Sequence, residues 1–338
     1  MAKILPDLDR GSGGDRQRID RRLARVMKMA PMVAAATARL REQGRWPETV
    51  RVRPHFVYRR TPAPGDPSDR RLPERRHRPP ATRILSPNGI ALRLYLIALF
   101  EAQMHARPGR RPANRLPLRA GGSETGWIDL IAVPVERHGS GTTSASVSDK
   151  KQRRVLSALK HLADLEVQLV HLPQLGMKTG KYEGFQLLDE GGVRENADAI
   201  PYVIPRKNEH AFDLPTGLFE NGWIHVLEDT ELAFVMMLAC RLHEARREAQ
   251  VKVQSDERIL HFGLGRDAYE AHMTLAGFGL VDVEVDENRH HDGKVRDFGR
   301  GGEARLHTFR LLWDGFGEPA AATVLRALRR ARHRGYRW

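Results

Sequence analysis

The stretch that most restricts the fold is 267–285, DAYEAHMTLAGFGLVDVEV, because its periodicity changes from helix to strand at two glycines. In its first half, apolar side chains lie three or four positions apart, on one helical face: Ala268, Ala271, Leu275 and Phe278. Gly277 and Gly279 then break the helix. Apolar residues next alternate with acidic ones, which is typical of a half-buried strand. The stretch predicts a helix and a strand joined by a glycine corner.

A similar pattern occurs earlier in the chain, in VLSALKHLADLEVQLV. The apolar residues that match those of the first pattern are Val155, Ala158, Leu162, Leu165 and Val167, opposite Ala268, Ala271, Leu275, Phe278 and Leu280. Few residues are identical, so the sequence predicts a repeat of structure rather than of sequence.

The chain divides into three predicted parts: a basic N-terminal extension (1–85), a first unit (86–200) and a second unit (201–338). The extension begins with a flexible tail (1–15). A helix over 16–43 follows, and Pro31 is expected to kink or split it. Residues 59–83 are dense in proline and arginine, which indicates a disordered linker or a basic strap along a partner. The linker is the favoured interpretation.

Each unit is predicted to run helix, helix, helix, strand, loop, strand. In the first unit we expect a helix at 86–104 with a Ser or Asn start, a short strand or helix at 126–133, a helix capped by Ser148, and antiparallel strands at 166–172 and 182–189. In the second we expect a helix from Asp229 to Arg246, a short helix at 255–262, the opening pattern, a returning strand at 304–313 and a basic C-terminal helix at 319–338.

The formal net charge of +14 and the pI of about 10.3 indicate polyanionic partners. Arginine predominates over lysine, and arginine is the better fork for phosphate and for guanine edges. The single cysteine, Cys240, allows no disulfide within the chain, which suits a reducing compartment. No apolar run is long enough for a membrane span, and the first residues lack the apolar core of a signal peptide. We therefore expect a soluble, cytoplasmic, nucleoid-associated protein without a membrane partner.

The order of elements resembles the winged helix-turn-helix, in which a third helix faces DNA and the following hairpin forms a wing. Two such units in one basic chain resemble the Rep-class replication initiators of plasmids, over roughly residues 86–313. The resemblance implies an α+β fold with two winged helix-turn-helix domains in tandem, a basic N-terminal extension and a C-terminal helix. It also implies that the domains bind repeated origin sites and help to open the duplex.

The predicted DNA-binding residues lie on the third helices, the wings and the C-terminal helix. On the third helix and wing of the first unit they are Lys150, Lys151, Arg153, Arg154, Ser157, Lys160, Lys178 and Lys181. On those of the second unit they are Arg266, Tyr269, Thr274, Arg289, Lys294, Arg296 and Arg300. The C-terminal helix adds Arg329 and Arg330. The third helix of the second unit is nearly neutral, so other residues must supply the attraction of this unit to phosphates. A second interpretation, in which that unit dimerises or binds another protein, stays open.

Searches for catalytic patterns give little. GMKTGKYEG lacks the spacing and the hydroxyl residue of a P-loop, and no paired carboxylates indicate a two-metal nuclease. The adjacent His290 and His291 would point to opposite sides of an extended loop, which argues against a metal site. We therefore expect a double-stranded DNA-binding protein that is not an enzyme and has no cofactor.

The leading hypothesis is an initiator for a plasmid or mobile element. The alternatives are a transcriptional regulator that binds a promoter operator, and an assembly protein whose winged helices bind proteins. Homodimers or cooperative multimers on repeated sites are also open.

Overall fold

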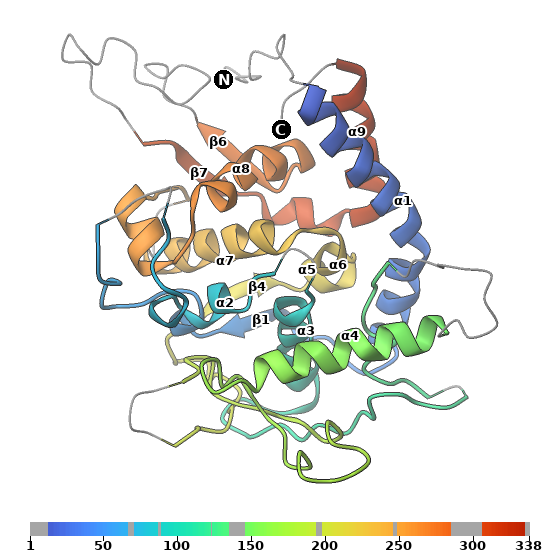
Figure 1. The fold of residues 1–338 in the computed structure, drawn as a ribbon. Helices are drawn as coiled ribbons and strands as arrows, with labels where there is room; N and C mark the ends of the chain where they lie inside the picture. The colour runs from blue at the N-terminus through green and yellow to red at the C-terminus, as the bar shows by residue number, and fades with distance from the viewer. Residues whose placement is uncertain are drawn as a thin grey trace, which may run out of the picture.

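The structure is a mixed α+β fold in which helices predominate and the strands form small sheets, as predicted for the class (Figure 1). This computed structural model describes residues 13–66, 71–86, 89–122, 124–134, 146–193, 198–245, 249–284 and 306–334. The α-helices are α1 (Gly13–Arg41), α2 (Pro80–Arg83), α3 (Ala91–His105), α4 (Val147–Leu162), α5 (Gly217–Glu220), α6 (Trp223–Val226), α7 (Asp229–Glu244), α8 (Arg266–Phe278) and α9 (Ala320–Arg334). Other helical turns are η1 (Pro54–Phe56), η2 (Arg75–His77), η3 (Glu257–His261) and η5 (Trp313–Gly317). The strands are β1 (Thr49–Val52), β2 (Val170–His171), β3 (Gln186–Leu187), β4 (Phe212–Pro215), β5 (Val251–Lys252), β6 (Val281–Glu284) and β7 (Thr308–Leu311).

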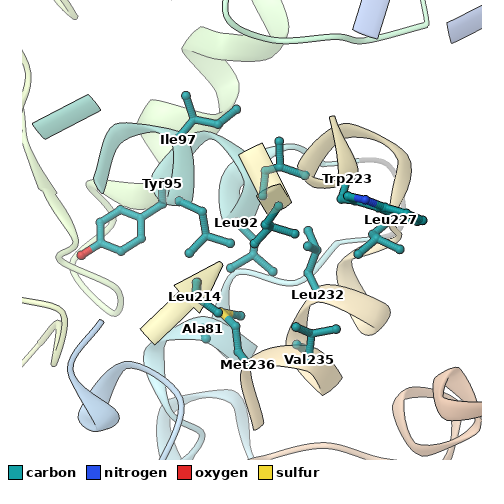
Figure 2. Packing of buried hydrophobic residues seen from close by; sticks show 14 of the residues in the cluster. Ala81, Leu92, Tyr95, Ile97, Leu214, Trp223, Leu227, Leu232, Val235 and Met236 are labelled. Carbon is teal, nitrogen blue, oxygen red and sulfur yellow. The ribbon is translucent and has the colours of Figure 1, made fainter. Parts of the chain in front are cut away.

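Two helices, α3 and α7, form the middle of the core. From Ala91 to Ala102 every side chain of α3 except Arg93 is buried, as expected of a helix that is apolar all round. Figure 2 shows side chains of α3 and α7 gathered with Leu214 of β4 and Trp223 of α6. The buried hydrophobic residues form one connected cluster that includes residues of both predicted units. The two units therefore share a core.

The N-terminal segment is built into this core, contrary to the prediction of an extension. Strand β1 pairs antiparallel with β4, so that Val50 lies opposite Leu214 and Val52 opposite Phe212. All four of these side chains are fully buried, because the alternation in TVRV turns both valines to one side. The strand is only four residues long, too short for its pattern to stand out in the sequence.

Helix α1 is continuous from Gly13 to Arg41, so Pro31 does not split it. A proline inside a helix removes one hydrogen bond and costs about 3 kcal/mol, and the burial of Met29 and Val33 on either side offsets this cost. The helix packs along α9, and the two lie side by side in Figure 1. Asp20 of α1 pairs with Arg332 of α9 at 2.9 Å, so the start of α1 lies beside the end of α9.

A buried ion pair fixes α1 to the beginning of α7. Arg22 donates to both carboxylate oxygens of Glu231, at 2.5 and 2.7 Å, and its guanidinium lies 4.9 Å from the ring centroid of Phe278 at the end of α8. Burial lowers the pKa of Arg22, but Glu231 and Glu228 raise it more, so the net shift is upward. Glu228 and Glu231 also form the capping box of α7, for which Asp229 was the predicted cap. Helix α1 thus positions both α7 and α8.

The first unit contains α3, α4 and a two-stranded sheet. Strands β2 and β3 pair antiparallel, which confirms the predicted pairing over a shorter length than expected. Helix α3 begins at Ala91, behind an Ile90 cap that makes no side-chain hydrogen bond, rather than at a Ser or Asn. The segment 126–133 is neither strand nor helix but contains turns that bury Trp127 and Ile128.

The second unit runs α7, β5, η3, α8, β6, β7, and its three strands lie in the order β5-β7-β6. Both pairings are antiparallel, so the last strand of the chain inserts between the other two. The predicted glycine corner is confirmed: α8 ends at Phe278, Gly279 has φ +78°, and β6 begins at Val281. Gly277 remains inside the helix. A left-handed residue at this place ends a helix and turns the chain at once into the strand.

The described parts of the proline- and arginine-rich segment are ordered, so the prediction of a disordered linker is wrong for them. The backbone N–H groups of Arg59 and Ala63 donate to the carbonyls of His261 and Leu260, at 3.0 and 2.9 Å. Farther along, the segment packs on Gly263, whose φ is +66° and whose added Cβ would lie 2.7 Å from the hydroxyl of Thr82. The segment follows the protein's own surface because its prolines need no backbone donor partner and its arginines bind carbonyls.

Candidate nucleic-acid interface

Helix α4 carries the largest group of predicted DNA-binding residues. It begins at Val147 behind a capping box, in which the Ser146 hydroxyl accepts from the Asp149 N–H at 3.1 Å. Ser148 was the predicted cap, and the correct one lies two residues earlier because Asp149 can then close the box. The hydrogen bonds from Ser146 hold the pKa of the Asp149 carboxyl below its usual range, with help from Arg119.

The two faces of α4 differ as predicted. Its core face buries Val155, Ala158, Leu159 and Leu162. On the opposite side the exposed residues are Arg153, Arg154, Ser157 and Lys160, and the half-buried Lys150 lies in the middle of this arc. We call these five residues the α4 stripe. Four of the five are cationic, so the stripe has the charge that phosphate contacts require.

Lys151 does not belong to this stripe, and the prediction that it points outward is wrong. One position along the helix turns it about 100° away from Lys150, toward the protein. Burial lowers the pKa of its ammonium, which the carboxylate of Asp129 only partly restores. Lys151 and Arg93 also lie close enough to His225 to lower its pKa, after burial, to about 3. Lys151 therefore lies half-buried on the side of α4 that faces the protein, near Arg93 and His225.

The wing of the first unit is the chain between β2 and β3. Lys178 and Lys181 are exposed there, as predicted. The return arm of the wing is joined to the beginning of α4 through two neighbouring residues. The Leu118 N–H donates to the carboxylate of Glu183 at 2.9 Å, and Arg119 donates to Asp149 of α4, also at 2.9 Å. These bonds hold the base of the wing beside the first turn of α4.

Helix α8 presents fewer free groups than predicted. Arg266 is exposed, but its guanidinium already binds the carboxylate of Glu270 at 2.8 Å. Thr274 is half-buried. Tyr269 does not point outward as predicted: its ring packs against the rings of Phe234 and Phe309, and the Arg258 guanidinium lies 4.9 Å from its centroid. Aromatic packing holds the half-buried Tyr269 against the core, although its position in the helix is one that can face outward.

Most of the wing of the second unit lies outside the described residues, and so do Arg289, Lys294, Arg296 and Arg300 predicted there. The histidine pair 290–291 also falls in this stretch. The base of the wing is described. There Arg310 of β7 lies opposite Asp282 of β6 and pairs with its carboxylate at 2.5 Å. The cationic arginine at this base is therefore already partnered.

The C-terminal helix was expected to pack on the second unit, and it also packs extensively on α1. Val324, Leu328 and Ala331 are buried, and α9 contacts α1, α6 and α8. Arg329 and Arg330 are exposed, as predicted. The N-terminal part of α1 adds exposed arginines that the sequence did not single out: Arg16, Arg18 and Arg21. Because the start of α1 lies beside the end of α9, both helices contribute cations to one end of the pair.

The proline- and arginine-rich segment supports the end of α4. The Arg75 guanidinium contacts the His161 ring on the last turn, and Arg83 donates to the carbonyl of Glu166 at 2.9 Å. The structural role of these arginines was not expected, because arginine next to proline in a sequence is as typical of an exposed segment as of one that supports a helix. In Figure 1 helix α4 lies in the lower half and α8 near the top, with α7 between them.

One group of metal-type ligands occurs in the described part of the chain: His55, Asp189 and Glu190. The carboxylate of Glu190 already accepts from the backbone N–H and the guanidinium of Arg53. Burial raises the pKa of Glu190 to about 7, although Arg53 lowers it. The Arg53 guanidinium also binds Glu209 at 2.6 Å. Glu190 is therefore already engaged by Arg53, which also binds Glu209 and so ties β1 to the segments around 190 and 209.

No family model, curated protein or solved structure matches this chain. Among the described residues, no helix is both long enough and apolar enough to cross a membrane.

Proposed function

We propose that the protein binds double-stranded DNA through two winged helix-turn-helix units, with α4 and α8 as the helices that face the groove. The observation that carries the proposal is the connectivity of the second unit. Its order α7, β5, η3, α8, β6, β7, with β7 inserted between β5 and β6, is the arrangement expected of a winged helix. The glycine corner at Gly279 places a wing directly after α8.

Charge supports the same proposal for the first unit. The α4 stripe has four cations and no carboxylate, and Lys178 and Lys181 extend the basic surface to the wing. The exposed arginines of α1 and α9 add to the +14 net charge of the chain. Phosphate neutralisation by such residues releases counterions and provides sequence-independent affinity.

As the biological role, we propose replication initiation on repeated sites of a plasmid or mobile element. Two groove-facing helices in one chain suit long sites made of repeats. A transcriptional regulator is the alternative, and it would protect a promoter palindrome. Footprinting on the DNA around the protein's own gene separates them: direct repeats beside an AT-rich segment support the initiator, and a single palindrome contradicts it.

DNA binding itself is tested by a salt titration with duplex DNA. If about six to ten phosphates are engaged, the affinity should fall by roughly three to five decades between 50 and 200 mM salt. A flat titration would contradict DNA binding by either unit.

A second candidate function follows from α8. Its one exposed arginine is paired with Glu270, which leaves this helix without excess positive charge. A neutral exposed helix favours a protein partner over phosphates. In that case the first unit would bind DNA and the second would bind protein, and removing the charges of α4 would abolish DNA binding altogether.

A further inference from the structure

The tip of the first wing exposes two large apolar side chains. Leu175 is 56% exposed and Met177 is 59% exposed, and every residue from 173 to 181 is exposed. Apolar side chains of this size usually lie inside a protein. Their neighbours in the sequence are cationic, since Lys178 and Lys181 lie within the tip and no acidic residue occurs from 172 to 182.

The tip has a defined backbone. Hydrogen bonds close successive turns, from the N–H of Leu175 to the carbonyl of Leu172 at 3.2 Å and from the N–H of Met177 to the carbonyl of Gln174 at 2.9 Å. Gly180, with φ +70°, then directs the chain back, and the Glu183 N–H donates to its carbonyl at 2.8 Å. The apolar pair is thus presented on a folded turn whose base is fixed beside α4.

Another exposed leucine of the same unit provides a comparison. Leu165 is 80% exposed in the corner after α4, where its neighbours are Asp164 and Glu166. Two carboxylates would repel a phosphate backbone, whereas two ammonium groups attract it. Exposed apolar side chains therefore have opposite electrostatic surroundings at these two places, and of the two only the wing tip suits a polyanion.

We propose that the tip is a minor-groove wedge, in which Leu175 and Met177 insert between base steps while Lys178 and Lys181 hold the adjacent phosphates. Leucine and methionine are among the side chains that unstack base steps and kink a duplex by about 20–90°. Pyrimidine–purine steps unstack most easily, so the wedge should favour TA and CA steps. This inference rests on the proposed DNA binding and adds to it a deformation of the DNA.

The test uses the full chain and a 40-base-pair AT-rich duplex with central TA steps, labelled at both ends for energy transfer. The wild-type protein should bring the ends closer and make thymines at the kinked step reactive to permanganate. The double variant Leu175→Ser/Met177→Ser should lose both signals and keep the salt slope of binding. The variant Lys178→Gln/Lys181→Gln should lower the salt slope by about 1.8, since each lost phosphate contact removes about 0.9.

The matched control is Leu165→Ser, which removes a more exposed leucine and should bend DNA like the wild type. The wedge is overturned if the Leu175/Met177 variant bends the duplex as the wild type does, or if the Leu165 variant loses bending to the same degree. A wild-type protein that binds duplex with a steep salt slope but leaves it straight overturns the wedge alone. A wild-type protein that does not bind duplex overturns the proposed function as well. If the double variant instead changes the sedimentation of the free protein and leaves bending intact, the tip is a protein contact.

Discussion

The first and the second unit differ in how regular their sheets are and in how much positive charge their exposed helices carry. In the second unit, a three-stranded sheet and the Gly279 corner form the framework, but the arginine of α8 is paired with Glu270 and its half-buried tyrosine packs against Phe309. The first unit has strands of only two residues, and no helix is described between α3 and α4, yet α4 carries four cations on its outer side and the wing two more. Geometry and charge therefore do not coincide in the two units. If both bind DNA as proposed, we expect the first unit to supply most of the affinity and the second to fix the orientation.

The largest expected effect is on the charge of α4. Replacing Lys150, Arg153, Arg154 and Lys160 by glutamine should lower the salt slope of duplex binding by about 3–4, at about 0.9 per phosphate contact. The affinity at 50 mM salt should fall by orders of magnitude, and the melting temperature should change little because three of the side chains are exposed and Lys150 is only half-buried. Lys151→Gln is the matched control and should leave the slope almost unchanged. A slope that is unaffected by the fourfold change would mean that α4 does not contact DNA.

The second prediction concerns the ion pair between Arg22 of α1 and Glu231 of α7, which holds α1 against the second unit. Glu231→Gln leaves the buried Arg22 without its carboxylate, so the free energy of unfolding should fall by about 3–5 kcal/mol. Glu270→Gln, which breaks the exposed pair on α8, should change it by at most about 1 kcal/mol. Urea titrations of both variants give the values. If the two variants lose the same free energy of unfolding, the Arg22–Glu231 pair does not stabilise the second unit.

The third prediction compares two buried histidines by their pH dependence. Burial first, then Arg93 and Lys151, lowers the pKa of His225 to about 3; burial lowers that of His272 on α8 to about 4. Below pH 6.5 both histidines take up a proton in the unfolded state but stay neutral in the folded state. The free energy of unfolding is therefore at its full value above that pH and decreases as the pH falls. Each histidine should contribute a loss of about 1.4 kcal/mol per pH unit, down to its folded pKa.

His225→Leu should therefore gain about 2 kcal/mol relative to the wild type between pH 6.5 and 5. Urea titrations at a series of pH values give the difference curve. A difference that stays constant over this range would show that His225 accepts a proton in the folded protein.

The fourth prediction concerns the choice of DNA sequence. Arg266→Ala should cost about 1–3 kcal/mol on the preferred site and little on scrambled DNA, if the arginine leaves Glu270 to bind a base edge. Competition binding with both duplexes measures the difference. Equal losses on the two would assign Arg266 to the backbone, and no loss on either would favour a protein partner for α8.

The smallest expected effect belongs to α9. Arg329→Gln with Arg330→Gln should lower the salt slope by about 1.8, half the change expected for α4. Substitution is preferable to truncation, because Ala331 is buried and deletion would remove part of the core. An unchanged slope in this variant, with an unchanged melting temperature, would show that these arginines are only solvated.

The local patterns of this sequence predicted local structure well. Apolar spacing located α8, and the glycine corner with alternating valines located β6, because these signals depend on neighbours in the chain. The faces of α4 also followed from helical geometry, except for Lys151 at the edge of the arc.

The sequence could not predict contacts between segments that lie far apart along the chain. The pairing of β1 with β4 and the packing of α1 on α9 join segments whose own patterns name no partner. The same holds for Arg22, whose position in an arginine-rich helix resembles a solvated face until Glu231 is placed opposite. Leu175 and Met177 can be read in the sequence, but only the folded chain shows that they are exposed.

The packing of α1 against α9 has a consequence for how the protein is made. Residues near 20 and near 332 must meet, and β1 must wait for β4, so many stabilising contacts have a long separation in sequence. Such contacts form late and slow the folding of a domain. During synthesis, α5, α6 and α7 become available to α1 first, whereas the part of its apolar stripe that α9 covers stays exposed until nearly the whole chain has been made. The first helix of the chain is thus completed by one of the last segments to be synthesised.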